Sequence, residues 1–507
     1  MFLVLNLGLK SIRSIIFDDQ FNIISSSARP LTTYIDNTIV EQCPNEWWSK
    51  GIEVINDSIS RLNRSKQILS FTVTASSCCV VPTDASGVPL SRVIMVSDKR
   101  ADQQNEKIKQ LSEYKELVAA GKTISSNTTL MLPKILWIKD NLPNVDERAK
   151  FYFSPNDYFI KRMCGVAVTD TLNAEKCGFS VTDGRYPATL LSALNIKEER
   201  LPNVVAPATV VGCVNNSDVP SELIGADVVV STYDAICAFV GAGPSRVGDG
   251  CDVSGTVTSL RVLAHANQEN EGSTNVFIQN ETAVGMKICG ASNNLGGGLI
   301  EWCKQAFYAS EKEAYGVMEA EATTANANIT DPIFLPYLMG ERAPLWNDNA
   351  RGVFFGLSRH HRRAHMTRAV FESAAFSLKL LSDEVEAITT VNNISVSGGL
   401  ARLNLINQMK ADVLNKEIKV LSEFETTAIG AYVYLLKSKN NDVSLAEVSK
   451  NTKIRQVIIP DTEKNKIYLS RFELFKSVYQ GLVSSFDALA SMEKNSVFQS
   501  KEIVENM

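Results

Sequence analysis

The sequence predicts an α/β protein made of two similar halves with a ligand cleft between them. Three observations support this fold class. The chain has 507 residues, more than one hydrophobic core usually organises. Strand-like and helix-like apolar patterns alternate along most of its length. A strand–glycine turn–strand outline at the amino terminus also recurs after residue 243, as expected for a duplicated α/β fold.

Composition narrows the class of protein. Apolar residues make up 45% of the chain and charged residues 21%, which is ordinary for a globular protein. The net charge of −5 provides no attraction to nucleic acid or to an anionic membrane. No apolar run approaches the roughly 20 residues of a membrane span, and no basic region precedes the apolar start. We therefore expect a cytoplasmic protein without a nucleic-acid or membrane partner.

Cysteine and histidine usage argues against a metal or disulfide framework. None of the ten cysteines forms a CxxC pair, so free thiols in a reducing cytoplasm are expected. Three of the four histidines lie within "RHHRRAH" (359–365), which leaves few for a zinc site or a Ser-His-Asp triad elsewhere. We interpret that segment as a solvated helix start.

The first half begins with three expected strands, in "FLVLNLG", "SIIFDD" and "NIISSSA". Apolar residues at three and four spacing in "NEWWSKGIEVINDSISRL" predict an amphipathic helix. "ILSFTVTASSCCVVPTD" predicts a further strand and turn, and 225–243 a buried strand entering a small-residue helix. Because "GAGPSRVGDG" clusters Gly and Pro, we place a first domain at 1–245.

The second half restarts the pattern in "GDGCDVSGTVTSLRVLAH" (248–265). Helical segments follow in "GLIEWCKQAF" and "HMTRAVFESAAFSLKLLSDEVEAI", and the strand "NISVSGG" leads into the helix "LINQMKADVL". We assign residues 246–485 to a second domain. The polar residues 486–507 are expected to form a frayed helix or tail.

Asp234 is the candidate catalytic base that the residues themselves suggest. It follows the buried strand "DVVV" at the carboxyl end, where α/β folds collect their chemistry. A carboxylate there can accept the proton of an attacking hydroxyl. The alternative is a helix N-cap, a position that aspartate favours.

Several segments, in order along the chain, resemble those of a known family. They are "VEQCPNEWW" (40–48), "IMVSDKRA" (94–101), "PYLMGERAPLWNDNARGVFFGL" (336–357) and "VSGGLARLNLINQMKADVL" (396–414). Together they resemble the FGGY family of carbohydrate kinases, within the actin and hexokinase superfamily. The resemblance implies two ribonuclease H-like (actin/hexokinase-type) domains.

The resemblance also implies an activity. It is the ATP-dependent phosphorylation of a hydroxyl of a small sugar (a pentulose, hexulose or polyol), with ATP and Mg²⁺ bound. The first domain would carry the sugar and the base, and the second the nucleotide. The sequence does not determine the oligomeric state, and a homodimer is one of the assemblies left open.

The sugar-side residues follow from the matched positions. The resemblance makes Asp234 the general base and a magnesium ligand, with Asn6 reaching the metal through water. It makes Asp98 and Arg100 sugar contacts, since a carboxylate and a guanidinium can bracket hydroxyls with charge-assisted hydrogen bonds. A surface ion pair is the alternative for these two. Ser76 and Ser77 replace larger family side chains, and we expect them to be hydroxyl partners of the sugar.

The nucleotide-side residues lie in three glycine-containing turns. Gly255 with Thr256 resembles the second phosphate motif of the family, in which glycine admits backbone N–H groups to phosphate oxygens. Gly398 with Gly399 resembles a Gly-Gly turn that the family uses for the adenosine and phosphate side of ATP. Ordinary strand-end turns would explain both pairs as well.

The first phosphate motif departs from the family pattern D-x-G-T-x-S. The chain keeps Gly8 and Ser11 but has Asn6, Leu9 and Lys10 in this loop. Magnesium prefers carboxylate oxygen or water, so an amide at residue 6 weakens the expected metal site. Lys10 could neutralise phosphate charge if it faced the ligand. Two hypotheses follow: an active kinase with an altered metal site, or a weak or silent homologue that binds sugar or nucleotide in a regulatory role.

Overall fold

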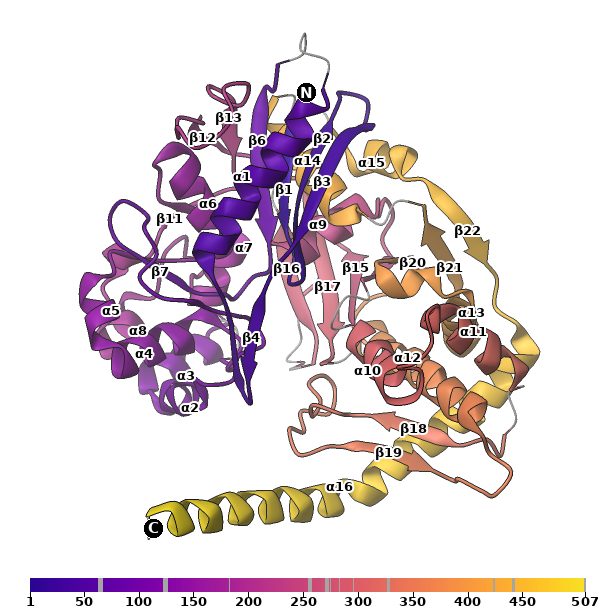
Figure 1. Cartoon of the computed structure of the whole chain (residues 1–507). Coiled ribbons are helices and arrows are strands. Elements are labelled where there is room, and N and C mark those ends of the chain that lie inside the picture. The colour runs from indigo at the N-terminus through magenta and orange to yellow at the C-terminus, as the bar shows by residue number, and fades with distance from the viewer. Residues whose placement is uncertain are drawn as a thin grey trace. The chain divides into compact units, whose positions relative to one another are not determined.

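The structure is a computed structural model, shown in Figure 1, and the chain divides into two units. It describes residues 1–62, 67–121, 126–181, 183–253, 258–269, 273, 275–281, 283–294, 296–325, 329–422, 425–439 and 443–505, with side chains up to 493. The first unit comprises Met1–Gly243, Glu281–Gly285 and Glu425–Asn451. The second comprises Pro244–Asn280, Met286–Phe424 and Thr452–Met507. The sequence-based division at residue 245 left out the two later segments of the first unit.

The first unit contains the sugar-side residues. Its strands are β1 (Phe2–Leu7), β2 (Ser11–Phe17), β3 (Ile23–Pro30), β4 (Thr33–Asp36), β5 (Ile39–Gln42), β6 (Ser70–Ala75), β7 (Val81–Thr83), β8 (Val93–Ile94), β9 (Phe151–Phe153), β10 (Val168–Asp170), β11 (Asn203–Val205), β12 (Val210–Cys213) and β13 (Asp227–Val229). Its helices are α1 (Pro44–Ser60), α2 (Asp102–Gln110), α3 (Ser112–Ala119), α4 (Met131–Asn141), α5 (Pro143–Arg148), α6 (Pro155–Cys164), α7 (Thr171–Ala174), α8 (Ala188–Ala193), α9 (Asp234–Gly241), α14 (Thr426–Lys439) and α15 (Leu445–Asn451).

A six-stranded sheet forms the centre of this unit, in the order β12-β13-β6-β1-β2-β3. Strands β1, β2 and β3 form an antiparallel meander, whereas β6 runs parallel to β1 and β13 parallel to β6. The carboxyl ends of β1, β6 and β13 therefore lie at one edge of the sheet. The residues that follow these three strands are brought together there.

The two faces of the sheet are covered by different helices, because side chains alternate along a strand. Leu3, Leu5 and Leu7 belong to a buried cluster with residues of α1 and α6. The opposite face of β1 is covered by α14, whose Tyr432 ring lies 5.5 Å from that of Phe2. Figure 1 shows α1 lying along the β1–β3 meander. Residue 6 thus lies on the face that α14 covers.

The second unit carries the nucleotide-side segments. Its strands are β14 (Asp249–Val253), β15 (Ser259–Ala264), β16 (Phe277–Glu281), β17 (Met286–Ser292), β18 (Ile333–Pro336), β19 (Gly352–Phe355), β20 (Asn393–Ser397), β21 (Glu417–Leu421) and β22 (Ile454–Ile458). Its helices are α10 (Gly297–Phe307), α11 (Ala314–Thr324), α12 (Arg363–Glu386), α13 (Asn404–Leu414) and α16 (Thr462–Glu505).

The sheet of the second unit repeats the topology of the first. Its order is β16-β17-β15-β14-β20-β21-β22. Strands β14, β15 and β17 form an antiparallel meander, and β20 and β21 add in parallel beside β14. The same succession occurs in β1, β2, β3, β6 and β13. The predicted α/β class and its duplicated architecture are therefore confirmed.

Smaller expectations have mixed outcomes. The histidines of "RHHRRAH" lie at the amino end of α12, and His360 is exposed, as expected for a solvated helix start. Helix α16 runs without interruption from Thr462 to Glu505, so no new segment begins at residue 486. Over the described part of the chain, no helix has both the length and the apolar character needed to cross a membrane.

Candidate active site

Asp234 and Ser76 meet at the edge of the first unit's sheet. Ser76 follows the last residue of β6, and its Oγ donates a hydrogen bond to Asp234 Oδ2 at 3.1 Å. Asp234 is the first residue of α9, and the N-cap position belongs to Tyr233, which makes no side-chain capping bond. The N-cap alternative for Asp234 is therefore wrong. A carboxylate in the first turn of a helix is stabilised by the helix dipole, which suits an anionic base.

Buried hydroxyl groups fix the segment that leads to Asp234. Thr72 Oγ1 donates to the carbonyl of Val229 at 2.7 Å, and Thr74 Oγ1 donates to that of Thr232 at 2.9 Å. Ser231 Oγ returns a bond to a β6 carbonyl at 2.6 Å. Each polar group is thereby satisfied within the core. Three hydrogen bonds thus join the end of β6 to the segment that leads into α9.

The opening loop forms a tight turn between β1 and β2. The Gly8 N–H donates to the Ser11 carbonyl at 3.0 Å. An added Cβ on Gly8 would meet its nearest atom at 3.4 Å, which is ordinary contact, so packing within the chain does not require glycine there. Lys10 is exposed, and its carbonyl accepts from the Leu31 N–H at 3.0 Å. The turn thus presents a small residue and a solvated cation.

Asn6 lies one residue before the end of β1 and is partly buried. Its register partners are Arg13 on β2 and Thr74 on β6, so the three side chains share one face of the sheet. Arg13 forms an ion pair with Glu425, directly before α14, and its Nε donates to Ser11 Oγ at 3.3 Å. Arg13 therefore lies beside Asn6, the residue at which the family pattern has a negatively charged aspartate.

Asp98 and Arg100 form a buried charged pair rather than the surface ion pair considered as the alternative. The Asp98 side chain is 0% exposed and that of Arg100 8%. Arg100 Nε and Nη2 donate to the carboxylate at 2.8 to 3.0 Å, and the Val40 N–H donates to it at 2.6 Å. Glu41 accepts from Arg100 Nη2 at 2.9 Å. The carboxylate is thus well engaged inside the protein.

In the second unit, Gly398 occupies a backbone conformation reserved for glycine. Its φ of 86° and ψ of −170° lie in a region that side chains exclude. A Cβ added to the next residue, Gly399, would meet nothing within 4 Å. Both glycines follow β20 and precede α13. This turn therefore offers backbone groups with open space in front of them. Gly255 and Thr256 lie outside the described residues.

Charge is also buried next to these segments. Lys410 Nζ on α13 lies 2.5 Å from Asp252 Oδ2 on β14, and both side chains are almost fully buried. Among the residues that the structure describes, no group of three or more His, Cys, Asp and Glu side chains is arranged to hold a metal ion.

Comparison with known proteins decides the family. The N-terminal domain of the FGGY family of carbohydrate kinases matches residues 1–241, and the C-terminal domain matches residues 253–436. The chain belongs to the FGGY family of carbohydrate kinases. It is therefore a phosphotransferase that acts on sugars.

The relatives of this FGGY kinase are named for different substrates. It is 25% identical to a gluconokinase of Bacillus licheniformis over 508 residues, covering 97% of this chain and 98% of that protein. It is 26% identical to a glycerol kinase of Thermococcus onnurineus over 442 residues, covering 85% and 87%. A ligand-bound xylulose kinase structure from Lactobacillus acidophilus matches with a TM-score of 0.85 at 21% identity, covering 96% and 100%. That structural likeness supports the fold alone.

Two residues near the candidate site, Arg13 and Lys134, were not predicted from the sequence. Arg13 became a candidate only once the strand register set it opposite Asn6. Lys134, on α4, is 0% exposed and reaches the segments that contain Ser76 and Asp98. The run "LPKILWIKDN" gave only a helical pattern, in which lysine is normally assigned to solvent.

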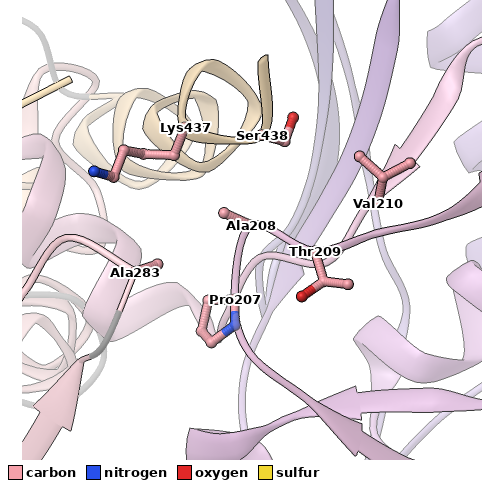
Figure 2. Close-up of a pocket in the computed structure, with 7 residues that line it drawn as sticks. All are labelled: Pro207, Ala208, Thr209, Val210, Ala283, Lys437 and Ser438. Carbon is pink, nitrogen blue, oxygen red and sulfur yellow. The ribbon is translucent and has the colours of Figure 1, made fainter. Parts of the chain in front are cut away.

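The structure of this FGGY kinase also contains a cavity of about 430 Å³ in the first unit. Figure 2 shows that α14 contributes Lys437 and Ser438 and that a loop and the start of β12 supply most of the other residues. The lining residues are Pro207, Ala208, Thr209, Val210, Ala283, Lys437 and Ser438. None of the predicted site residues lines this cavity, so we assign it no part in catalysis.

Proposed function

We propose that this FGGY kinase transfers the γ-phosphoryl group of ATP to a hydroxyl of a small sugar, a sugar acid or a polyol. The observation that carries the proposal is the Ser76–Asp234 pair at the carboxyl edge of β6 and at the start of α9. The names of the relatives support the substrate class, since they include gluconokinase, xylulose kinase and glycerol kinase.

In the proposed reaction, Asp234 accepts the proton of the attacking sugar hydroxyl. Ser76 orients the Asp234 carboxylate, and Arg100 contributes hydrogen-bond donors to the sugar while Asp98 holds its guanidinium in place. Gly398 and Gly399 accommodate the nucleotide, because a turn without side chains admits backbone N–H groups to phosphate oxygens.

Phosphate charge must be neutralised for transfer to occur. Arg13 is suited to this, since it shares a sheet face with Asn6 and 41% of its side chain is exposed. Mg²⁺ in kinases takes one or two carboxylates together with phosphate oxygens. Asp234 supplies one carboxylate, and the Asn6 amide can bond a metal-bound water, so these residues fit the ion. When bound, Mg²⁺ would supply charge neutralisation at the phosphates.

The free thiols support a cytoplasmic location, which we include in the proposal. All ten cysteines are unpaired, and seven of the eight buried ones have a thiol pKa raised by burial. Unpaired cysteines are the usual state of a protein in a reducing compartment.

The test begins with a thermal-shift screen of pentuloses, hexuloses, gluconate and glycerol, with and without ATP and Mg²⁺. ADP release is then measured with the sugar that stabilises the protein. Asp234→Asn should lower kcat by roughly 10²- to 10⁴-fold, the range that a general base contributes. The matched control is Asp102→Asn, because Asp102 is also the first residue of a helix in the same unit. Unaltered turnover in Asp234→Asn would exclude Asp234 as the base.

The second candidate function is a weak or silent homologue that binds sugar or nucleotide for regulation. Asn6 favours it, since the neutral amide lies where a carboxylate would support the metal. This candidate predicts that the screen detects ligands while no sugar supports ADP release.

A double substitution, Asn6→Asp with Leu9→Thr, separates an adapted loop from a decayed one. We expect no gain in kcat, or a loss, because the active kinase would use Arg13 and Lys10 around a neutral residue 6. A gain of several orders of magnitude would instead identify a decayed site. Leu9 packs against the core, so its replacement could destabilise the first unit. Urea unfolding of the double variant measures this effect.

A further inference from the structure

Lys134 is a fully buried lysine whose side chain bonds only to backbone carbonyls. Its Nζ donates to the carbonyls of Cys78 and Met95, each at 2.8 Å. It also donates to that of Thr129 at 2.9 Å and, at a longer 3.3 Å, to that of Val96. An ammonium group has three N–H donors, so three short bonds and one longer one match its capacity. The charged form is thus satisfied although the residue is 0% exposed.

Two of these carbonyls belong to a loop that ends in the Asp98–Arg100 pair. Met95 and Val96 lie three and two residues before Asp98, and the Asp98 N–H donates to the Met95 carbonyl at 3.1 Å. That carbonyl accepts from Lys134 as well. The position of the pair therefore depends on a carbonyl that Lys134 holds.

A third carbonyl belongs to the segment that carries Ser76. Cys78 lies two residues after Ser76 and has a φ of 64°, a conformation that non-glycine residues rarely adopt. A strained residue keeps such a conformation only where its surroundings determine it. The Lys134 bond to the Cys78 carbonyl is one such constraint, and it lies next to the serine that orients Asp234.

We propose that Lys134 is a positioning residue of the sugar site, whose ammonium ties the Ser76–Cys78 turn to the Met95–Asp98 loop. The inference rests on the proposed function, in which the first segment orients Asp234 through Ser76 and the second leads to the Asp98–Arg100 pair that contacts the sugar. Lys134 itself does not touch the substrate. It sets the distance between the residues that orient Asp234 and those that contact the sugar, which lie about twenty residues apart in the sequence.

The test compares two lysines on the same helix. Lys139 on α4 also donates to backbone carbonyls, those of Leu194 and Asn195, which lie in neither sugar segment. Lys134→Met should raise the KM for the sugar about 10- to 100-fold, because misplacement of contacts by about 1 Å has effects of this size. The KM for ATP should change less than about twofold. Lys139→Met should leave both KM values at the wild-type level.

Hydrogen exchange supplies a readout that needs no sugar. In Lys134→Met, amides of residues 76–80 and 95–98 should exchange faster than in the wild type, while those of 194–196 do not change. Lys139→Met should give the reverse pattern. An unchanged exchange rate in 76–80 and 95–98, or an unchanged sugar KM in an active enzyme, would overturn the inference. A wild-type protein that binds no sugar would instead overturn the proposed function and leave the exchange test valid.

A second substitution tests the route through Cys78. Glycine adopts a φ of 64° without strain, so Cys78→Gly should recover part of the sugar affinity that Lys134→Met loses. Additive losses in the double variant would exclude this route. If Lys134→Met gives no folded protein, Lys134→Gln keeps two N–H donors and should show a smaller increase in sugar KM with the same selectivity over ATP. An equal increase in both KM values would contradict the proposal.

Discussion

Asp157 is a buried carboxyl group in the first turn of α6. Its Oδ2 accepts from the Ser154 N–H at 2.8 Å, and Ser154 Oγ accepts from the Asp157 N–H at 3.3 Å, a reciprocal capping arrangement. Burial raises the pKa of Asp157 from 3.8 to about 7. The folded state therefore binds this proton more tightly than the unfolded state does.

The raised pKa of Asp157 makes the stability of the protein depend on pH. Between pH 4 and pH 7 the unfolded chain has lost the Asp157 proton and the native protein retains it, so stability falls as pH rises. The slope for one group is at most ~1.4 kcal/mol per pH unit. Asp157→Asn cannot titrate and should flatten this part of the profile, measured as urea midpoints at pH 4.5 and pH 7. A variant whose profile matched the wild type would show that other groups set it.

The sequence alone predicted the roles of some site residues but not of others. Asp234 could be selected because it follows a buried strand, and the resemblance named Asp98 and Arg100. The buried state of that pair was not predictable, since "SDKRA" contains no apolar pattern. Lys134 was missed because its partners are carbonyls, and every residue has one. Only tertiary structure determines which carbonyls surround a given lysine.

Helices α9 and α14 pack at backbone contact, although about 190 residues separate them in sequence. A Cβ on Gly430 would lie 1.7 Å from the Cys237 carbonyl oxygen, and one on Gly241 would lie 1.9 Å from that of Thr426. Neither overlap can be relieved by rotating a side chain, since the opposing atoms are main chain. The two glycines therefore allow α14 to come close to the helix that begins with Asp234.

Gly430→Ala should accordingly destabilise the protein by about 1 to 3 kcal/mol or more, the range for overpacked cores. Gly481→Ala is the matched control, because Gly481 lies within α16, is exposed, and an added Cβ there meets nothing within 4 Å. Its helix propensity should raise stability by about 0.5 to 1 kcal/mol. Urea unfolding measures both changes. Equal effects of the two substitutions would contradict the close packing.

Elements with a strong local pattern were predictable from the sequence. The β1–β3 meander and α1 follow from alternating and helical apolar spacing, and both occur in the structure. The N-cap alternative for Asp234 was open from the sequence because aspartate favours that position, and the structure gives the N-cap to Tyr233 instead. The packing of α14 against α9 could not be predicted, because the sequence of α14 indicates a helix but not its partner.

At the scale of the whole molecule, the first unit is discontinuous in sequence. It recruits Glu425–Asn451 after most of the second unit has been traversed. Tyr432 of this segment stacks on Phe17 at 4.6 Å and meets Phe2 edge-on, so it closes one face of the central sheet. A division by position alone, such as 1–245, could not include it. Long-range packing, rather than a linker signal, defines the unit.

A fragment ending at Gly243 should therefore not fold cooperatively. It would expose the apolar sheet face that α14 covers, and we expect a broad urea transition and binding of an apolar dye. The same fragment joined through a flexible linker to residues 425–451 should recover a single sharp transition. A sharp transition in the shorter fragment would show that α14 is dispensable for the fold of this unit.

The late arrival of α14 also orders events during synthesis on the ribosome. At typical translation rates, residues 425–451 emerge roughly 10 to 40 s after Gly243. Until then the nascent chain carries an uncovered sheet face beside the helix that begins with the proposed base. The amino-terminal part would be a client for chaperones throughout that interval, and the start of α9 could acquire its final packing only after residues 425–451 have emerged.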